Sequence, residues 1–430
     1  MAQTLKFGNG TWATKKGSTL AYSDTNNSFK PLPFTYTGAG KGTRVNKEGL
    51  IEVVENDRPR IDYLDSEDGV FLLEKAATNL LTYSEDFINS YWSKVRIETP
   101  YIADVLSPDG TLNVNTLEIS NGETNGGGVY AVNISLSGEN SFSVFAKKKT
   151  ANYLVLSDSG TTTNAVYFDL ENGIVGTTYN ATGEIQDFGN GWYRCTMKYT
   201  LTSSGLKFIY LSNVDGLTNG GVVGGDSIYI YGAQIESGNV SSYIPTQGTI
   251  QTRVQETASG SGNSEVFNSE EGILYAEGSL INDDGTPNNI TLGDNTFSNN
   301  RMMLLFSNGI SNRISARFDS IGSDVTLNAD GYDLTLNHKV VLKYKANDIA
   351  IWVDGFEIES GDFSFSAPSL LNRIDFYNPF GGGQNNFYGK TKEIAYYDEV
   401  LTDLELETLT SYRTWEEMVK ELNLNIIHNE

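Results

Sequence analysis

The sequence contains little of the side-chain chemistry on which most enzymes and metal sites depend. Its 430 residues include one cysteine, Cys195, and two histidines, His338 and His428. A single cysteine excludes an internal disulfide and a cysteine-based metal cluster. Two isolated histidines leave few candidates for a Ser–His–Asp or Cys–His catalytic group, or for an imidazole-based zinc or iron site. We interpret Cys195 as a small residue of an alternating strand and His338 as structural, and we expect no enzyme.

Cations and long apolar runs are also scarce. The chain has 30 Lys and Arg against 54 Asp and Glu, a formal net charge of −24. Because binding to a phosphate backbone needs clustered cations, we expect no nucleic-acid partner. No run of about 18 apolar residues occurs, so we expect no membrane insertion. The opening residues MAQTLKFGNGTW lack the basic start and apolar stretch of a secretory signal, so we expect no export by such a signal.

Aromatic and turn-forming residues are abundant instead. The chain has 24 Tyr, 20 Phe and 44 Gly. Short runs rich in Val, Ile, Tyr and Thr lie between turn signals, which is typical of an all-β fold. The length exceeds one typical core, so two or three domains are expected. The sequence therefore predicts two tandem β-sandwiches of the jelly-roll kind.

Composition suggests where these domains begin and end. Residues 1–71 hold three of the nine prolines and closely spaced glycines, so we expect an extended section with few regular elements that orders itself against a partner or the next domain. Residues 72–256 alternate in the manner of a first sandwich. Residues 257–270 are rich in Gly and Ser, which predicts a flexible linker. Residues 271–413 form the second sandwich.

The clearest local pattern is a hairpin in the second sandwich. Val340, Leu342 and Tyr344 share one face, and Ile349, Ile351 and Val353 alternate on the return strand. Asp354-Gly355 then predicts a tight turn into a further strand. Such regular alternation of apolar and polar residues predicts that one face of these strands packs on a core.

The C-terminal residues 402–424 predict an amphipathic helix. Thr402 and Glu405 have capping-box spacing, in which each side chain bonds the backbone of the other residue. An apolar stripe follows at three- and four-residue spacing: Leu409, Tyr412, Trp415, Val419 and Leu422. The stripe is expected to pack on the sandwich or, as the alternative, to associate with other copies around a threefold axis.

Glycan binding is the chemistry that the composition supports best. Sugars present apolar faces and hydroxyl groups, so a site needs aromatic side chains beside amides and carboxylates. One loop region combines these residues: Tyr377, Asn378, Phe380, Gln384, Asn385 and Tyr388. They are the candidate glycan-binding residues, and aromatic residues of the core are the alternative interpretation.

Metal and hydrolase chemistry have weaker support. Asp283 and Asp284 place carboxylates in a turn, so calcium is a candidate cofactor there, with ordinary Asx turns as the alternative. No other cofactor is expected. The acidic strand motif of laminarinase-like glucanases, E-x-D-x-x-E, is missing where the second sandwich would carry it. Glu52, Glu55 and Asp57 cluster elsewhere, so hydrolase or lyase activity is disfavoured.

A series of ordered motifs resembles proteins of tailed bacteriophages. Residues 72–81 (LLEKAATNLL), followed by YSEDF at 83–87 and Trp92, are similar to an opening found in many phage fibre and spike proteins. The same resemblance includes SPDGT at 107–111, FGNGWYR at 188–194, GAQIE at 232–236, SYIPT at 242–246, and a lead-in with TRVN at 43–46. Apart from this upstream lead-in, the resemblance covers residues 72–254, and it implies a carbohydrate-binding jelly roll.

The second sandwich resembles a concanavalin A-like or laminin G-like domain. The matching residues are 338–344 (HKVVLKY), 351–355 (IWVDG), 387–389 (FYG) with Ile394, and Leu401 to Asp403 with Glu405. That fold includes lectins, glucanases and structural modules, so it does not define a function.

Together these resemblances imply a head or tail fibre of a phage that adheres to host surface polysaccharide. Such a protein would assemble in the host cytoplasm, be displayed on the virion, contact other virion proteins through residues 1–71, and form a homotrimer by analogy with fibres. A bacterial surface adhesin or accessory carbohydrate-binding protein is the first alternative, and a glycan depolymerase is the second.

Overall fold

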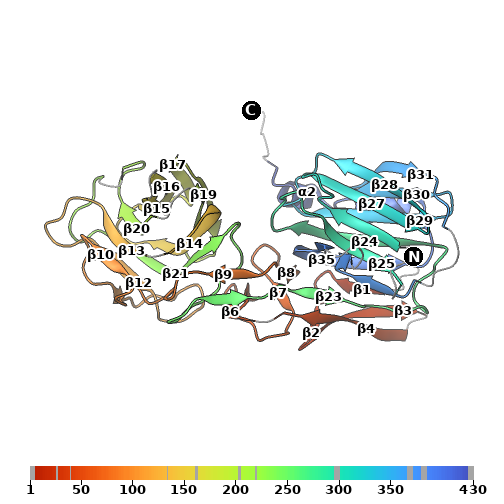
Figure 1. Ribbon diagram of the computed structural model, residues 1–430, viewed down its shortest axis with the longest axis horizontal. Coiled ribbons are helices and arrows are strands. Elements are labelled where there is room, and N and C mark those ends of the chain that lie inside the picture. The colour runs from red at the N-terminus through yellow and green to blue at the C-terminus, as the bar shows by residue number, and fades with distance from the viewer. Residues whose placement is uncertain are drawn as a thin grey trace. The chain divides into compact units, whose positions relative to one another are not determined.

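The computed structural model describes residues 5–25, 28–38, 40–132, 134–159, 163–201, 205–217, 220–294, 301–365, 371–378 and 385–424. These residues form an all-β structure with two short helices near the C-terminus, as the sequence predicts. The chain divides into two compact units (Figure 1). Unit 1 contains Met1–Ala39, Asn56–Lys75 and Gln255–Glu430, and unit 2 contains Gly40–Glu55 and Ala76–Val254.

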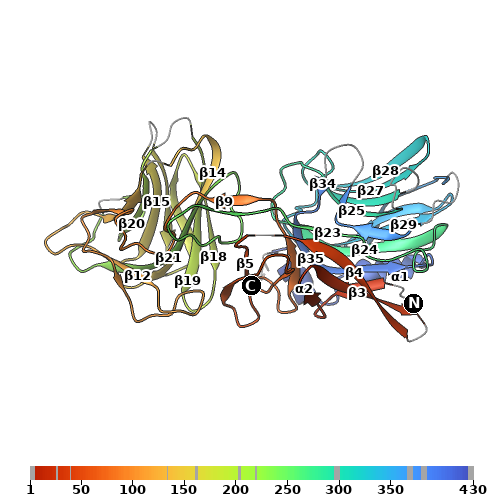
Figure 2. The same cartoon turned by 60° about the horizontal axis from the view of Figure 1, so that its bottom comes forward.

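Unit 1 is a sandwich of two sheets. Across sheet A the order is β23 (Thr257–Ser259), β4 (Ser28–Thr37), β3 (Ser18–Thr25), β1 (Leu5–Gly8), β35 (Gly389–Tyr397), β24 (Glu271–Leu280), β29 (His338–Lys345), β30 (Ile349–Val353) and β31 (Phe356–Gly361). Three further strands pair beside this path: β2 (Ala13–Lys15) with β3, β8 (Val70–Leu73) with β35, and β7 (Arg60–Asp62) with β8. Across sheet B the order is β28 (Ser323–Asp330), β27 (Arg313–Ser320), β26 (Arg301–Phe306), β25 (Asn288–Gly293), β34 (Asn385–Asn386) and β33 (Tyr377–Asn378), with β32 (Arg373–Asp375) paired to β25. Figure 2 shows these two layers of unit 1 from the side.

The predicted hairpin of unit 1 is confirmed. Strands β29 and β30 pair antiparallel with Val340 opposite Val353 and Leu342 opposite Ile351. All four side chains are buried in the core between sheets A and B. Asp354 and Gly355 both have positive φ (49° and 91°), as a tight two-residue turn requires.

Unit 2 is a second sandwich with its own core. Across sheet C the order is β10 (Ser93–Val95), β13 (Gly127–Ala131), β20 (Lys207–Ser212), β15 (Tyr153–Ser159), β16 (Thr163–Asp169) and β17 (Ile174–Tyr179). Across sheet D the order is β11 (Tyr101–Ile102), β12 (Asn115–Glu118), β21 (Ser227–Ser237), β14 (Gly138–Lys148), β19 (Trp192–Leu201) and β18 (Thr182–Asp187). Two short pairs complete it, β9 (Ala77–Asn79) with β22 (Gln251–Arg253) and β5 (Thr43–Val45) with β6 (Ile51–Val53).

The expectation of an extended section at residues 1–71 is wrong. Strand β1 lies inside sheet A, paired along its length with β35. Phe7 and Phe34 are 1% and 0% exposed, and their rings lie 4.9 Å apart in the core of unit 1. These residues bury apolar surface against strands that lie more than 200 residues later in the chain, which composition alone does not reveal. Residues 40–55 belong instead to unit 2.

The predicted linker at residues 257–270 is also incorrect. Strand β23 pairs with β4, and its Ala258 is fully buried. The backbone N–H of Ser261 donates to the carbonyl of Ile374 (3.1 Å). Phe267 is 5% exposed and its ring lies 4.8 Å from that of Tyr396. A Gly- and Ser-rich segment is held in place here because an aromatic side chain anchors it.

The C-terminal segment forms two helices instead of one. Thr402 and Glu405 make the predicted capping box at the start of α1 (Asp403–Thr410). Helix α1 packs on sheet A through the buried Leu406, beside Trp352. The chain then breaks, and Thr414 caps a second helix, α2 (Trp415–Glu421). Its Trp415 is 60% exposed, so the predicted continuous stripe is divided. Neither helix has the length and apolar composition needed to cross a membrane, and the other described residues contain no such helix.

Candidate functional site

The glycan-binding residues predicted from the sequence lie at the end of sheet B. Asn378 of β33 is paired with Asn385 of β34. The amide oxygen of Asn378 accepts a hydrogen bond from Arg301 (3.2 Å), and the hydroxyl of Tyr388 accepts one from Asn386 (2.8 Å). Tyr377, Asn378, Asn385 and Tyr388 are all half-buried. Phe380 and Gln384 lie outside the described residues.

The calcium candidates serve as hydrogen-bond acceptors in turns. Asp283 accepts from the hydroxyl of Ser307 and from the backbone N–H of Asn312, both at 2.5 Å. Asp284 accepts from the backbone N–H of Thr286 (2.9 Å) and pairs with Lys75 (3.1 Å). Within the described part of the chain, no group of three or more His, Cys, Asp or Glu side chains is arranged to hold a metal ion.

His338 has a structural position, as interpreted from the sequence. Its ring is 2% exposed. Nδ1 lies 2.7 Å from Oδ2 of Asp354, and Nε2 lies 2.9 Å from the carbonyl oxygen of Asp333. Both ring nitrogens therefore contact acceptors within the fold, and the ring braces the turn at Asp354-Gly355. Cys195 is fully buried, and burial raises the pKa of its thiol well above the usual range.

A different set of residues forms an aromatic face on unit 2. We use this name for the side chains that point away from the core of unit 2 on strands β13, β20, β15, β16 and β17 of sheet C. Its members are Tyr130, Tyr153, Tyr179, Phe208 and Tyr210, together with Tyr167, which is buried in a small cluster with Val155 and Ala165. Alternation along each strand directs their neighbours, such as Leu154, Ile209 and Leu211, into the core.

Strand register brings these rings into rows. Tyr130 is opposite Phe208, and Tyr210 is opposite Val155, which is itself opposite Tyr167. The rings of Tyr130 and Phe208 lie 5.1 Å apart, and those of Phe208 and Tyr210 lie 4.8 Å apart. These separations are within the range of favourable aromatic pairs.

A glycine makes room for one of these rings. A Cβ at Gly128 would lie 2.0 Å from the carbonyl oxygen of Ile209 and 2.7 Å from Cδ1 of Tyr210, both closer than real Cβ contacts allow. The Tyr210 ring therefore occupies the space that any other residue at position 128 would fill. Burial raises the pKa of the Tyr210 hydroxyl to about 12, although the nearby Arg96 cation opposes this shift. The hydroxyl thus stays protonated and able to donate a hydrogen bond across the physiological range.

Polar groups border the far end of the aromatic face. Asp215 accepts hydrogen bonds from the backbone N–H (2.8 Å) and the hydroxyl (3.0 Å) of Thr177 on β17. The hydroxyl of Tyr179 donates to the carbonyl of Gly216 (3.1 Å), while its ring is 45% exposed. Asp169, opposite Tyr153, is buried, and its carboxylate accepts hydrogen bonds from the backbone N–H groups of Glu171 and Asn172. Exposed and half-exposed rings beside hydroxyl groups are suited to stacking and hydrogen bonding.

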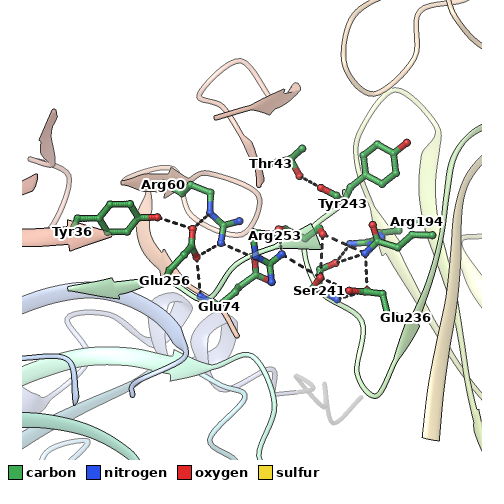
Figure 3. A network of polar contacts seen from close by, with 12 residues as sticks. Tyr36, Thr43, Arg60, Glu74, Arg194, Glu236, Ser241, Tyr243, Arg253 and Glu256 are labelled. Carbon is green, nitrogen blue, oxygen red and sulfur yellow. Dashed lines mark hydrogen bonds and ion pairs between the residues drawn. The ribbon is translucent and has the colours of Figure 1, made fainter. Parts of the chain in front are cut away.

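Each unit contains a network of buried ion pairs and hydrogen bonds close to the passages of the chain after Lys75 and Val254 (Figure 3). In unit 1, Nε of Arg60 donates to Oε1 of Glu256 (2.7 Å) and its Nη2 pairs with Glu74 (2.7 Å). The hydroxyl of Tyr36 donates to the same Glu256 oxygen (2.7 Å). Arg60, Glu74 and Glu256 are 1%, 3% and 3% exposed. This network joins β7 and β4 to two segments at the edge of unit 1.

The corresponding network of unit 2 surrounds Ser241. The Ser241 hydroxyl donates to Oε1 of Glu236 (2.6 Å), and its carbonyl accepts from Arg194 (2.8 Å). Nη1 of Arg253 donates to the Ser241 hydroxyl (3.3 Å), and the hydroxyl of Thr43 donates to the carbonyl of Tyr243 (2.6 Å) (Figure 3). Burial raises the pKa of Glu236. We interpret both networks as structural because their groups bond to one another within each unit.

Sequence reasoning did not find the aromatic face. The signal is present as alternation, since Phe208 and Tyr210 are two residues apart in the strand KFIYLS, and Tyr153 and Val155 are two apart in YLVLS. Alternation shows that a strand has two faces, but it does not show which of them is exposed. The register that gathers rings from five strands comes from pairings up to about 80 residues apart.

No protein-family model matches the sequence, and no curated protein matches it. Among solved structures, the CBM40 module of a Ruminococcus gnavus IT-sialidase bound to α2,3-sialyllactose is 15% identical with a TM-score of 0.30, covering 36% of this chain and 94% of that one. Domains LG4-5 of the mouse laminin α1 chain are 9% identical with a TM-score of 0.25, covering 64% and 86%. A Trypanosoma rangeli sialidase is 11% identical with a TM-score of 0.27, covering 91% and 81%. The sequence identities and TM-scores of these three structures are too low to assign their ligands to this chain.

Proposed function

We propose that the protein binds glycans through the aromatic face of unit 2. The observation that carries this proposal is the gathering of Tyr130, Phe208, Tyr210 and Tyr179 on the outer surface of one sheet. Aromatic rings stack on the apolar faces of sugar rings, and the hydroxyls of Tyr179 and Tyr210 offer partners for sugar hydroxyls.

The proposed role of the protein is that of a fibre on the virion of a tailed phage, attaching to host surface polysaccharide. The ordered motifs of residues 72–254 that resemble phage fibre and spike proteins support this role. A homotrimer would repeat the aromatic face, so several weak contacts would act together with useful avidity.

The binding proposal is tested by titrating purified host surface polysaccharide into the wild type, Tyr210→Ala and Tyr101→Ala by calorimetry. Loss of one stacking ring costs about 0.5–1.5 kcal/mol, so Tyr210→Ala should weaken binding by roughly twofold to tenfold. Tyr101→Ala is the matched control, because Tyr101 is 43% exposed on sheet D of the same unit. Its affinity should equal that of the wild type.

Other outcomes would redirect the assignment. Equal affinities of Tyr210→Ala and the wild type, together with a loss in Tyr388→Ala, would move the site to the end of sheet B. Release of oligosaccharides from the polysaccharide during the titration would indicate a depolymerase. Antibodies against this chain that fail to label purified particles in electron microscopy would contradict the virion role and favour a bacterial adhesin.

A further inference from the structure

The core of unit 2 contains a lysine and a carboxylate in direct contact. Lys207 is the first residue of β20 and Asp158 lies on β15, and the two are directly opposite each other in sheet C. Their inward direction follows from alternation, since Ile209 and Leu156 on the same faces belong to the core. Nζ of Lys207 lies 2.6 Å from Oδ2 of Asp158, and both side chains are 0% exposed.

This pair differs from the buried ion pair between Arg60 and Glu256 in unit 1. Glu256 in unit 1 accepts hydrogen bonds from Arg60, Tyr36 and the backbone N–H of Glu74. In contrast, neither carboxylate oxygen of Asp158 has a hydrogen bond of ordinary geometry, despite the short distance to Nζ. A fully buried carboxylate without such bonds is costly, because attraction to a single cation offsets desolvation only when the remaining lone pairs are also satisfied.

Tyr199 completes the group from the opposite sheet. It lies on β19 of sheet D and is 5% exposed. Burial raises the pKa of its hydroxyl, and the proximity of the Asp158 carboxylate raises it further. The hydroxyl therefore stays protonated, and it makes no hydrogen bond of ordinary geometry with another group. The lysine amine, the carboxyl group and a protonated hydroxyl thus lie together in a site that excludes water.

We propose that Lys207 and Asp158 are joined by an amide bond that the folded chain forms without another reactant. A proton passes from Nζ to the carboxylate, which leaves a neutral amine and a carboxylic acid. The Nζ lone pair then attacks Cγ, the new C–N bond forms, one C–O bond breaks, and the oxygen leaves as water with two protons that came from Nζ. The Tyr199 hydroxyl donates a hydrogen bond to the carboxyl oxygen as negative charge develops on it.

Two physical effects favour this condensation. Groups held at contact distance react with effective concentrations of about 10⁵ M or more, which offsets the slowness of amide formation in solution. The product replaces two buried charges by one neutral amide, which removes the desolvation cost of the ion pair. The same exclusion of water protects the amide from hydrolysis.

The cross-link would tie together the two central strands of the sheet that carries the aromatic face. A disulfide stabilises a domain by closing a loop in the unfolded chain. The chain has one cysteine and forms no internal disulfide, so the amide would supply the same kind of closure between residues 158 and 207.

Intact mass spectrometry of the denatured full chain tests the proposal. The wild type should be lighter than its sequence mass, with or without the initiating Met, by the mass of one water molecule. Lys207→Met should have its full sequence mass and migrate more slowly in denaturing gels. Trypsin should fail to cleave after Lys207 but should cleave after Lys345, which is paired with Glu271 at a similar distance (2.8 Å) yet is half exposed.

The mass of the wild type shows whether the amide bond is present even if Lys207→Met does not fold. A full sequence mass, with normal cleavage after Lys207, would overturn the proposal and leave a buried ion pair. A deficit equal to one ammonia molecule would also overturn it, since it would assign the bond to an asparagine.

Discussion

Replacing Arg60 by methionine should destabilise unit 1 strongly. Arg60 is 1% exposed and its guanidinium contacts the carboxylates of Glu256 and Glu74, which are both 3% exposed. Methionine fills most of the volume but removes the cation that both buried carboxylates contact. Removing one partner of a buried ion pair costs about 3–5 kcal/mol, and this arginine serves two partners. We expect a loss of at least about 3 kcal/mol in the free energy of unfolding.

Urea denaturation followed by circular dichroism would measure this loss. Arg313→Met is the control, because Arg313 makes a bidentate pair with Asp330 (2.6 and 3.0 Å) whose side chain is 61% exposed. Solvent screens that pair, so its removal should leave the unfolding midpoint unchanged. Equal midpoints for the wild type and Arg60→Met, or equal losses in both variants, would refute the conclusion that burial makes the Arg60 network important.

Three further predictions concern other parts of the fold. Burial and the nearby Asp109 carboxylate raise the pKa of Glu85, so the folded state binds this proton more tightly than the unfolded chain does. Stability should therefore fall as pH rises above the ordinary Glu pKa. Melting temperatures measured from pH ~4 to ~7 should change less with pH in Glu85→Gln than in the wild type. Phe267→Ala should cost about 3–5 kcal/mol in a urea titration if the Gly- and Ser-rich segment is anchored by this ring, whereas a flexible linker would lose nothing. Leu406→Ala should cost about 2–5 kcal/mol because the side chain is fully buried, and Trp415→Ala should cost almost nothing at 60% exposure; the reverse order would contradict the division into two helices.

The fold was predictable from the sequence where its interactions are local. The hairpin around Asp354-Gly355 and the capping box at Thr402 depend on residues a few positions apart, so period and spacing define them. Strand β1 was missed because its pairing partner β35 lies at the other end of the sequence. The local pairing of β2, β3 and β4 was missed because the prolines and glycines of residues 1–71 indicated irregular structure. The anchoring role of Phe267 was missed for a related reason. The composition of residues 257–270 indicates a flexible segment on average, whereas the single buried ring of Phe267 holds this segment in place.

The candidate site was predictable only as a kind of chemistry. The abundance of tyrosine favours carbohydrate binding, and the residues predicted from the sequence, such as Tyr377 and Asn378, are aromatic and amide residues adjacent in the sequence. In a sheet, residues that share a surface are adjacent across strands instead, as Tyr130 and Phe208 are. Only the strand register identifies such neighbours.

The division of the chain into units has a consequence for modular exchange. The sequence passes from one unit to the other four times, before Gly40, after Glu55, after Lys75 and after Val254. Unit 2 therefore cannot be transferred to another protein as one continuous cassette, and a single protease cut at any one passage leaves three peptide connections intact. A transfer of the proposed glycan-binding surface to another protein would have to exchange strands and loops within unit 2 and leave these four connections in place.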